Sequence, residues 1–562
     1  MLKYGGVTAT AAGQKCLIKN TYSYIDFENR FIYDVNKYKY EVNKCRTALH
    51  LQKNRSKGEN NMRNLDTPVK RIRHKVFTAV ARIGFESSDE TLIQDIESIP
   101  YEIVQERAKY RDSIYRERAV ASERIRLAMG LSLRPENKAV HLTSGLEASN
   151  IDEKYYEPPL MQVIPSACAA CPPNKYVVTN MCRGCMAHPC MQVCPKGAIS
   201  MVNGKSHIDQ EKCIKCGKCK SVCPYDAISH NVRPCEQACG VKAIGNDEQG
   251  RAKILEDKCV SCGMCMVSCP FGAISDKSQI FQLAHSLREG NDIIAIIAPS
   301  YVSQFGDDVT PGKFKTALEI LGFSGVYEVA LGADIGAISE AHHYANKVAT
   351  GELPFLLTSC CPSWSMMAKK FFPAMIDNIS QELTPMVATA RRVKQEHPDS
   401  KVVFIGPCAS KKLEAMRTTV RSDVDFVVTF EELSAMFDAR DIDPAAFDEE
   451  DAPQDATAAG RGYAVAGGVA GAIEACLKEY YPDVPVHIEH AETLADCKKV
   501  LSLAKAGKLK GCMIEGMACP GGCMGGAGTN VPFAKSSKAL KKYLAETDKK
   551  IPPRELEDIE LK

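Results

Sequence analysis

The chain has 562 residues, and its 71 lysines and arginines nearly balance its 69 aspartates and glutamates, for a formal net charge of +2. This balance indicates neither nucleic acid nor an anionic membrane as a partner. No apolar run approaches the roughly 18 residues of a spanning helix, and the first residues lack the apolar core of a secretory signal. We therefore expect a cytoplasmic protein.

The first part of the chain divides into three segments by composition. Residues 1–61, rich in Tyr, Asn and Lys, have no sustained apolar period and are predicted to form a poorly ordered extension; alternatively, translation starts at Met62. Residues 62–160 carry amphipathic patterns in which basic and acidic positions alternate, and these predict a helical segment with solvated faces. Residues 161–280 are rich in cysteine.

Beyond the cysteine-rich segment, short apolar runs alternate with helical patterns. Six runs are typical of buried strands: IIAIIA, VYEVAL, KVVFIG, DFVVTF, VPVHIE and GCMIEG. Strands that alternate with helices predict an α/β domain with mixed or largely parallel sheets and flanking helices over residues 285–535. Residues 536–562 are expected to be a C-terminal tail.

Cysteine is the unusual feature of the composition, with 26 in the chain and 16 of them from Cys168 to Cys269. Dense cysteine indicates disulfides in short secreted chains, but this chain is long and shows no export signal. Many of its cysteine pairs are separated by two residues, a spacing that presents two thiolates to one metal centre from a single turn. Metal ligation is therefore the favoured interpretation.

The cysteine-rich segment contains an internal repeat. Four of its stretches end alike, with a cysteine, a turn and an Ala-Ile pair: CPKGAI, CPYDAI, CGVKAI and CPFGAI. This ending is the half-unit of a bacterial ferredoxin, and two half-units enclose two cubane clusters. Four half-units predict two ferredoxin-like α+β modules in tandem. Zinc ribbons also contain C-x2-C pairs, but a zinc site has no need for the repeated ending.

The spacing within the repeats also predicts which cysteines share a cluster. In the run C-x2-C-x2-C-x3-C-P, the first three thiolates hold one [4Fe–4S] cluster and the fourth binds the neighbouring cluster. Two runs of this chain have that spacing, one has a wider middle gap, and one is split. If the last cysteine of each run binds the neighbouring cluster, four sets of ligands are predicted: Cys182, Cys185, Cys190 and Cys223; Cys213, Cys216, Cys219 and Cys194; Cys259, Cys262, Cys265 and Cys239; and Cys168, Cys171, Cys235 and Cys269.

Three further cysteine motifs lie in the α/β domain: TSCCPSW, PCASKKLE and EGMACPGGCMGGAG. Each follows an apolar run on a loop rich in Pro or Gly, and ligand sites of α/β sheets commonly lie at such strand ends. Four thiolates can hold one more cubane, from Cys408, Cys519, Cys523 and either Cys360 or Cys361.

In this order the three motifs resemble the H-cluster signatures of the [FeFe]-hydrogenases, and the resemblance covers about two-thirds of the chain. It implies a [4Fe–4S] subcluster bound by Cys361, Cys408, Cys519 and Cys523. It also implies that Cys523 bridges to a two-iron subcluster with CO, cyanide and azadithiolate ligands. Dedicated maturation proteins would insert this diiron unit.

The resemblance implies roles for residues around the diiron unit. Lys411 matches a lysine that hydrogen-bonds a cyanide ligand, and Met517 matches a methionine near the bridging carbonyl. The segment that lines the dithiolate and a cyanide is matched by Ala298, Pro299 and Ser300.

A proton route is implied as well. Cys360 matches the thiol that passes protons to the bridgehead amine, and Glu340 and Ser380 match the carboxylate and hydroxyl beyond it. His343 stands where many members carry a second glutamate, and a histidine can relay protons near neutral pH.

Some positions depart from the family pattern. Ser363 replaces a common glycine, Gly406 stands where a methionine often precedes Pro-Cys, and Ala527 interrupts a glycine run. These changes favour a less-studied branch, such as group B.

The expected function is the reversible interconversion of protons and electrons with H2, with a small ferredoxin-like electron carrier as partner. Two alternatives are a hydrogen sensor and a prelamin-recognition-factor-like iron–sulfur assembly protein. Sensory relatives usually carry an added signalling domain, for which the chain after Gly528 is short. The retention of Cys360, Lys411 and Met517 favours catalysis over assembly.

Overall fold

The computed structural model describes residues 67–420, 423–448, 452, 456–558 and 561, together with the short strands β1 (Thr10–Ala11) and β2 (Gln14–Lys15). Met1–Asn60 and Asn61–Lys562 form two separate units. Apart from β1 and β2, the predicted extension over residues 1–61 lies outside the described residues. Among the described helices, none combines the length and apolarity that a bilayer crossing requires.

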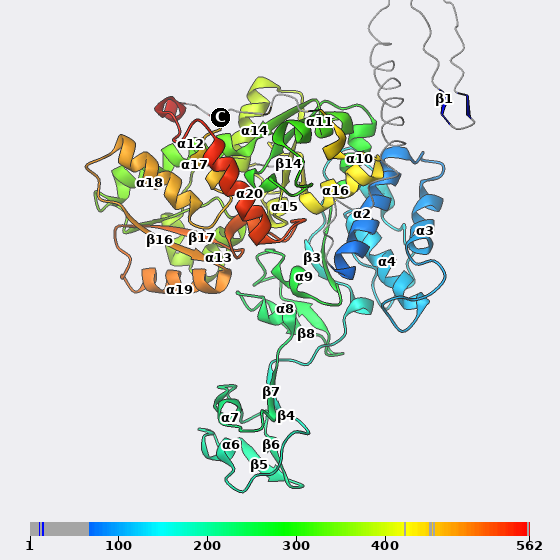
Figure 1. Ribbon diagram of the computed structural model, residues 1–562, viewed down its shortest axis with the longest axis vertical. Coiled ribbons are helices and arrows are strands. Elements are labelled where there is room, and N and C mark those ends of the chain that lie inside the picture. The colour runs from blue at the N-terminus through cyan, green and yellow to red at the C-terminus, as the bar shows by residue number, and fades with distance from the viewer. Residues whose placement is uncertain are drawn as a thin grey trace, which may run out of the picture. The chain divides into compact units, whose positions relative to one another are not determined.

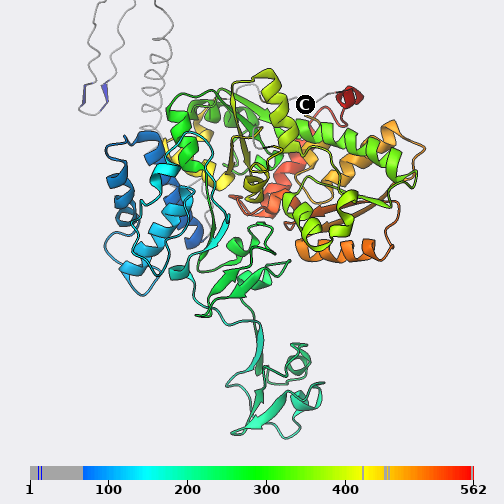
Figure 2. The same cartoon turned by 180° about the vertical axis from the view of Figure 1, so that it is seen from behind.

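The predicted N-terminal helices are α2 (Pro68–Glu86), α3 (Leu92–Ile103) and α4 (Ile114–Ala128), which lie together in Figures 1 and 2. Helix α2 begins where the Thr67 hydroxyl accepts a hydrogen bond from the Lys70 amide, with Pro68 in the first turn. It packs on α10 (Ile280–Arg288) and α16 (Phe430–Ala439). Gly84 permits this approach, because a Cβ there would lie 2.7 Å from the Cβ of Ala284.

Short antiparallel strand pairs build two cysteine-rich modules, which are named outer and inner by their order along the chain and not by their position in space. The outer module pairs β3 (Met161–Val163) with β10 (Ile274–Asp276), and β8 (Ile244–Asn246) with β9 (Ala252–Ile254). The inner module pairs β4 (Lys175–Val178) with β7 (Ile228–Asn231), and β5 (Ile199–Val202) with β6 (Lys205–Ile208). Because β4–β7 lie between β3 and β8 in the chain, the inner module is inserted into the outer one. The tandem order expected from the repeats is therefore a nested order.

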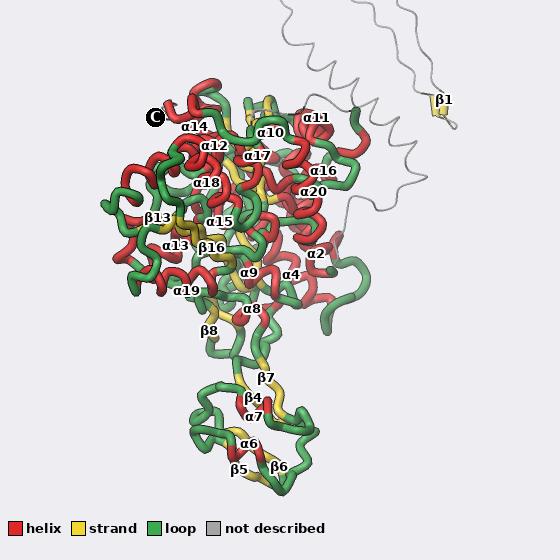
Figure 3. The backbone as a smooth tube through the Cα atoms, turned by 60° about the vertical axis from the view of Figure 1, so that its left-hand side comes forward, coloured by secondary structure: helices red, strands yellow, loops and turns green. Residues whose placement is uncertain are grey.

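Loops make up most of the inner module, as Figure 3 shows. Each half-unit contributes one short helix that carries a cysteine. These helices are α6 (Pro189–Gln192), α7 (Lys218–Ser221), α8 (Pro234–Gln237) and α9 (Met264–Ser268).

Two parallel sheets form the remainder and confirm the α/β prediction. The first has the strand order β12-β11-β14-β15, with β11 (Ile293–Ile297), β12 (Gly325–Glu328), β14 (Lys401–Gly406) and β15 (Phe426–Thr429). The second has the order β13-β17-β16, with β13 (Phe355–Leu357), β16 (His487–Glu492) and β17 (Cys512–Met517). Strands β11 and β15 are buried along their whole length and belong to the larger hydrophobic core.

Helices surround both sheets. They are α11 (Pro311–Leu321), α12 (Val329–His343), α13 (Pro362–Phe371), α14 (Pro385–Glu396), α15 (Ser410–Glu414), α17 (Ala458–Gly462), α18 (Gly468–Tyr480), α19 (Leu494–Lys505) and α20 (Phe533–Glu546).

The C-terminal segment differs from the expected tail. Residues 536–546 belong to α20, whose Leu540 is fully buried against Ala464 and Met524. The boundary placed at residue 535 therefore divides a helix that is part of the α/β domain. The sequence did not predict the packing of α20, because FAKSSKALKKYLAE has only a narrow apolar stripe between its lysines.

Candidate metal centres

A central cavity of about 90 Å³ lies where the carboxyl ends of both sheets meet. The loop after β11 contributes Ala298, Pro299 and Ser300 to its wall. The loops after β13, β14 and β17 contribute all five cysteines of the three motifs: Cys360, Cys361, Cys408, Cys519 and Cys523. The sequence motifs, which are separated by up to about 160 residues, thus face one space because parallel strands end at one edge.

Four of these thiols are mutual electrostatic neighbours. Burial and the nearby Cys361 together raise the pKa of Cys408 to about 11, and Lys411 opposes this shift. Burial likewise raises the pKa of Cys523 to about 12, with Cys408 and Cys361 adding to the shift. The pKa of Cys519 is raised by burial and by the same neighbours. Soft sulfur donors that converge in a buried apolar space fit an iron–sulfur cluster.

The adjacent cysteines of the first motif have different surroundings. Burial raises the pKa of Cys361, but the backbone amides of Ala518 and Trp364 donate hydrogen bonds to its sulfur and oppose the shift. Burial also raises the pKa of Cys360, and there the neighbouring Cys361 and Glu340 add to the shift. Amide N–H groups that point at a sulfur stabilise a thiolate ligand, so Cys361 has the environment of a ligand and Cys360 that of a protonated thiol.

Other polar groups line the same cavity. Lys411 on α15 is buried and forms an ion pair of 2.7 Å with Glu414. The hydroxyls of Ser300 and Tyr463 are buried without a hydrogen-bond partner, and Met517 at the end of β17 is 3% exposed. Two orphaned hydroxyls in one cavity fit a bound group that offers hydrogen-bond acceptors.

A chain of polar residues leads from the cavity toward the surface. Burial raises the pKa of Glu340 on α12 to about 7, and hydrogen bonds from the Ser380 hydroxyl and the Ser359 amide oppose the shift. The Ser380 hydroxyl also accepts a hydrogen bond of 3.3 Å from the Glu382 amide. Glu382 Oε1 lies 4.0 Å from Nδ1 of His343, and these two side chains are 37% and 23% exposed.

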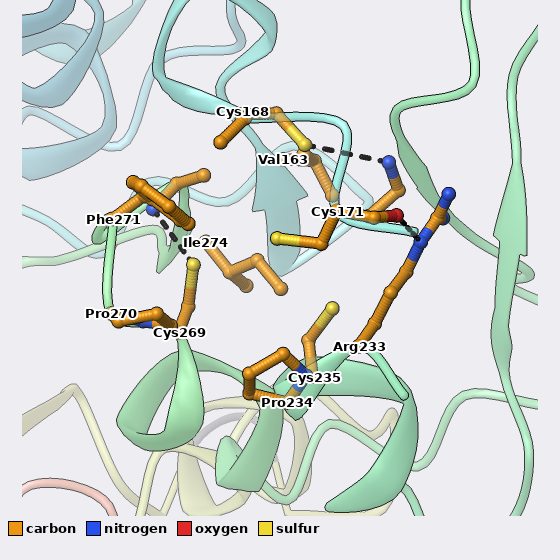
Figure 4. Close-up of a pocket in the computed structure, with 13 residues that line it drawn as sticks. Val163, Cys168, Cys171, Arg233, Pro234, Cys235, Cys269, Pro270, Phe271 and Ile274 are labelled. Carbon is orange, nitrogen blue, oxygen red and sulfur yellow. Dashed lines mark hydrogen bonds between the residues drawn. The ribbon is translucent and has the colours of Figure 1, made fainter. Parts of the chain in front are cut away.

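The structure also groups the cysteines of the two modules. One cavity of about 20 Å³ in the outer module is lined by Cys168, Cys171, Cys235 and Cys269, whose side chains face a common space in Figure 4. A second cavity of about 20 Å³ in the inner module is lined by Cys182, Cys185, Cys190 and Cys223.

The other two predicted sets are also brought together. The pKa of Cys265 is raised well above its usual value by burial and by the neighbouring thiols of Cys262, Cys259 and Cys239. Cys262 also lines the central cavity, so this set adjoins it. In the inner module, Cys213 and Cys216 are neighbours that raise the pKa of Cys219, in addition to burial. Cys194 lies in one apolar cluster with Cys213 and Cys219, which also contains Cys190 and Cys223 of the other inner-module set.

The repeated Ala-Ile ending has a structural reason. In every half-unit the alanine four residues after the last cysteine donates its backbone N–H to that cysteine's sulfur. The four distances are 3.3 Å for Ala198 to Cys194, 3.4 Å for Ala227 to Cys223, 3.1 Å for Ala243 to Cys239 and 3.3 Å for Ala273 to Cys269. Such bonds stabilise thiolates that bind clusters.

Three residues that lie at these sites could not be predicted as site residues from the sequence. Tyr463 precedes the Gly-rich turn before α18, Glu382 lies in a loop, and Arg233 lines the cavity of the outer module. Each is a single polar residue outside any motif, so only the folded chain places it.

The comparisons with known proteins match the parts of the chain that contain these sites. The family profile "Iron only hydrogenase large subunit, C-terminal domain" matches residues 291–527. The profiles "4Fe-4S binding domain" and "LdpA Fe-S cluster-binding domain" match residues 206–229 and 229–280.

Individual proteins are similar over longer stretches. "Iron hydrogenase 1" of Clostridium pasteurianum is 30% identical over 389 residues, which cover 59% of this chain and 67% of that protein. "Periplasmic [Fe] hydrogenase large subunit" of Nitratidesulfovibrio vulgaris is 27% identical, over 58% of this chain and 86% of that protein. A solved structure of a variant of the [FeFe]-hydrogenase HydA1 from Chlamydomonas reinhardtii is 23% identical, covers 44% of this chain and 84% of its own, and has a TM-score of 0.38.

Proposed function

This chain belongs to the iron-only hydrogenase family, and on that premise we propose that it catalyses the reversible interconversion of protons and electrons with H2. The observation that carries the proposal is the central cavity, where four mutually close thiols meet a fifth thiol, that of Cys360, which has Glu340 as a neighbour. A protein that only transfers electrons does not require a fifth thiol in this cavity or the nearby carboxyl group of Glu340.

The central cavity is proposed to hold the H-cluster. Its [4Fe–4S] part would be bound by Cys361, Cys408, Cys519 and Cys523, and Cys523 would also bridge to the diiron part with its CO, cyanide and azadithiolate ligands. When bound, this cofactor supplies the iron site at which H2 is formed or split. Lys411 and Ser300 would donate hydrogen bonds to the cyanides, because both residues line this cavity and carry polar hydrogens, and the Ser300 hydroxyl has no hydrogen-bond partner among the described residues.

Protons would reach the cavity through Cys360, Glu340 and Ser380. The raised pKa of Cys360 keeps its sulfur protonated, so the thiol can give a proton to a base bound in the cavity. Glu340, with a pKa of about 7, can then return a proton to that sulfur. His343 and Glu382 stand at the exposed end of this route, where Nδ1 of His343 lies 4.0 Å from Oε1 of Glu382.

Electrons would pass through four accessory [4Fe–4S] clusters in the two modules, bound by the four predicted sets of cysteines. The set that contains Cys262 adjoins the central cavity, so it would be the last cluster before the H-cluster. A ferredoxin-like carrier is the proposed electron partner, since the clusters are single-electron centres. We also propose that maturation proteins insert the diiron unit and that the protein acts in the cytoplasm.

The function is tested with the full-length chain co-produced with diiron maturation proteins. Wild type is expected to form H2 from reduced methyl viologen. Cys523→Ser should lose at least 10²-fold of this activity, because it removes the only proposed protein bond to the diiron unit, while the electron paramagnetic resonance (EPR) signals of the accessory clusters remain.

Cys476→Ala is the matched control, because Cys476 is a buried cysteine of α18 that does not line the cavity. This variant should keep wild-type activity. Hydrogen formation by Cys523→Ser at the wild-type rate would contradict the assignment. An inactive wild type with full cluster content would favour the sensor or assembly alternative.

A further inference from the structure

A buried cation forms part of the wall of the outer-module cavity. Arg233, at the start of α8, is 2% exposed and lines the cavity with Cys168, Cys171, Cys235 and Cys269, as Figure 4 shows. Its guanidinium lies beside Cys171 in that view, with its Nε donating a hydrogen bond to the Cys171 carbonyl.

All the hydrogen bonds of Arg233 go to neutral acceptors. Besides the Cys171 carbonyl, these are the carbonyls of Gly245 and Gly250 and the side-chain oxygen of Asn246. Within residues 67–420, 423–448 and 456–558, no carboxylate forms an ion pair with this guanidinium. An arginine keeps its charge at any pH that proteins meet, and a buried charge without an opposite charge is strongly unfavourable. The protein part of this site is therefore electrostatically incomplete.

The groups that the positive charge favours are the thiolates of the cavity. Cys171 and Cys235 line this cavity together with Arg233, and the Arg233 Nε is hydrogen-bonded to the Cys171 carbonyl. Four thiolates around an oxidised [4Fe–4S] core give a net charge of −2, and reduction by one electron makes it −3. Such a cluster would supply the counter-charge that Arg233 lacks.

Two more arginines donate hydrogen bonds to the loop that follows Cys269, one of the four cysteines of this cavity. Arg124 on α4 is buried and donates a hydrogen bond to the Gly272 carbonyl, and Arg111 donates one of 3.0 Å to the Phe271 carbonyl. Both carbonyls lie in the loop directly after Cys269. The inner-module cavity differs, since the cations around it, Arg183 and Lys205, are exposed, and solvent screens exposed charges.

We propose that Arg233 is the counter-charge of the cluster bound by Cys168, Cys171, Cys235 and Cys269, and that it raises this cluster's reduction potential above those of the inner-module clusters. The inference rests on the cluster assignment of the proposed function. Reduction adds one electron from the carrier to the cluster and moves no proton, because the guanidinium stays charged. A nearby positive charge stabilises the reduced form more than the oxidised form. An electron in transit would therefore rest at this cluster before it moves to the central cavity.

The test is an EPR-monitored redox titration of the full-length protein with its clusters assembled. In Arg233→Gln, one cluster should become harder to reduce, with its reduced-to-oxidised ratio at a fixed potential falling roughly tenfold, a shift of about 59 mV for a one-electron couple. Arg233→Lys keeps the charge and should restore most of the wild-type potential. Arg251→Gln is the matched control, because Arg251 lies near the same strands but is paired with Glu136 and Asp247.

An unchanged set of potentials in Arg233→Gln with all clusters present overturns the proposal. If Arg233→Gln loses four irons, Arg233→Lys decides: a retained cluster at the wild-type potential supports the counter-charge, and loss in both variants shows a purely structural arginine. Failure of the proposed function looks different, because the wild type itself would then lack a cluster in the outer module.

Discussion

Cys360 and Cys361 are neighbours in the chain and yet differ in what surrounds their sulfurs. Backbone amides of α13 and of the loop after β17 point at Cys361, whereas Glu340 and Glu515 lie near Cys360. This difference supports the proposal that Cys361 is a cluster ligand and Cys360 a proton carrier. The sequence alone left both as candidate ligands until the family resemblance was considered.

Replacement of Cys360 tests this separation. Serine is similar in size but a far weaker acid than a thiol, so Cys360→Ser should keep the assembled cofactor and lose roughly 10²–10⁴-fold of H2 turnover, the usual range for proton transfer by a positioned group. Cys360→Asp, which is acidic, should retain more activity than Cys360→Ser. Cys361→Ser should instead reduce the iron content. Wild-type turnover by Cys360→Ser with an intact infrared spectrum would rule out this proton route.

Glu340 provides the pH-dependent prediction. Burial raises its pKa from 4.5 to about 7 in the folded chain, so the folded state holds this proton more tightly than the unfolded state. The stabilisation is complete below about pH 4.5 and is lost as the pH rises to about 7. In an infrared pH titration, the band of a protonated carboxyl should disappear with a midpoint near pH 7.

Glu340→Gln should lack that band and should turn over H2 slowly at every pH. Asp334→Asn is the control, since Asp334 is a second buried carboxyl of α12 whose pKa is raised to about 6 by burial but which binds Thr457 instead of lining the route. Asp334→Asn should keep the carboxyl band whose titration midpoint is near pH 7. A band that persists in Glu340→Gln would mean that another carboxyl titrates there.

At the scale of elements, the sequence predicted most strands but not all of their limits. KVVFIG coincides with β14, whereas VYEVAL is divided between β12 and the start of α12, because an apolar run does not itself distinguish a strand from a buried helix. Strand β13 was missed because its apolar run, FLL, is only three residues long. The nested order left one trace in the sequence, the cysteine run that is split around the inner module, and the pairing of β3 with β10 shows that the segments before and after the inner module form one module.

The contact between α13 and β17 holds the first and third cysteine motifs together. Trp364 is fully buried and lies flat on Gly516, where a Cβ would come within 2.1 Å of its ring. Gly516→Ala must displace the indole, and overpacking of this kind costs about 1–3 kcal/mol or more. We expect a lower melting temperature and loss of iron from the central site.

Gly471→Ala controls for the added methyl group. Gly471 lies on α18 with open space where its Cβ would stand, and alanine favours the helix. This variant should be as stable as wild type or more so. Equal melting temperatures and iron contents for Gly516→Ala and wild type would show that the indole can move without consequence.

At the scale of the whole molecule, the cysteine motifs predicted the sites better than they predicted the architecture. Ligand spacing is local, so it can be read from the chain, and the parallel strands then bring distant motifs to one cavity. Arg233, Tyr463 and Glu382 come from positions that have no spacing or composition to mark them. Helix α20 was likewise unpredictable, because its role depends on a surface that exists only after the sheets have formed.

The central claim is that this chain carries a diiron centre with CO and cyanide ligands in its central cavity. The most direct measurement is the infrared spectrum of the full-length protein co-produced with diiron maturation proteins, beside the same protein produced without them. The account predicts bands of metal-bound CO and cyanide only in the matured sample, and these bands should change when H2 replaces argon. A matured sample with its full complement of cubane clusters and no such bands would contradict the claim.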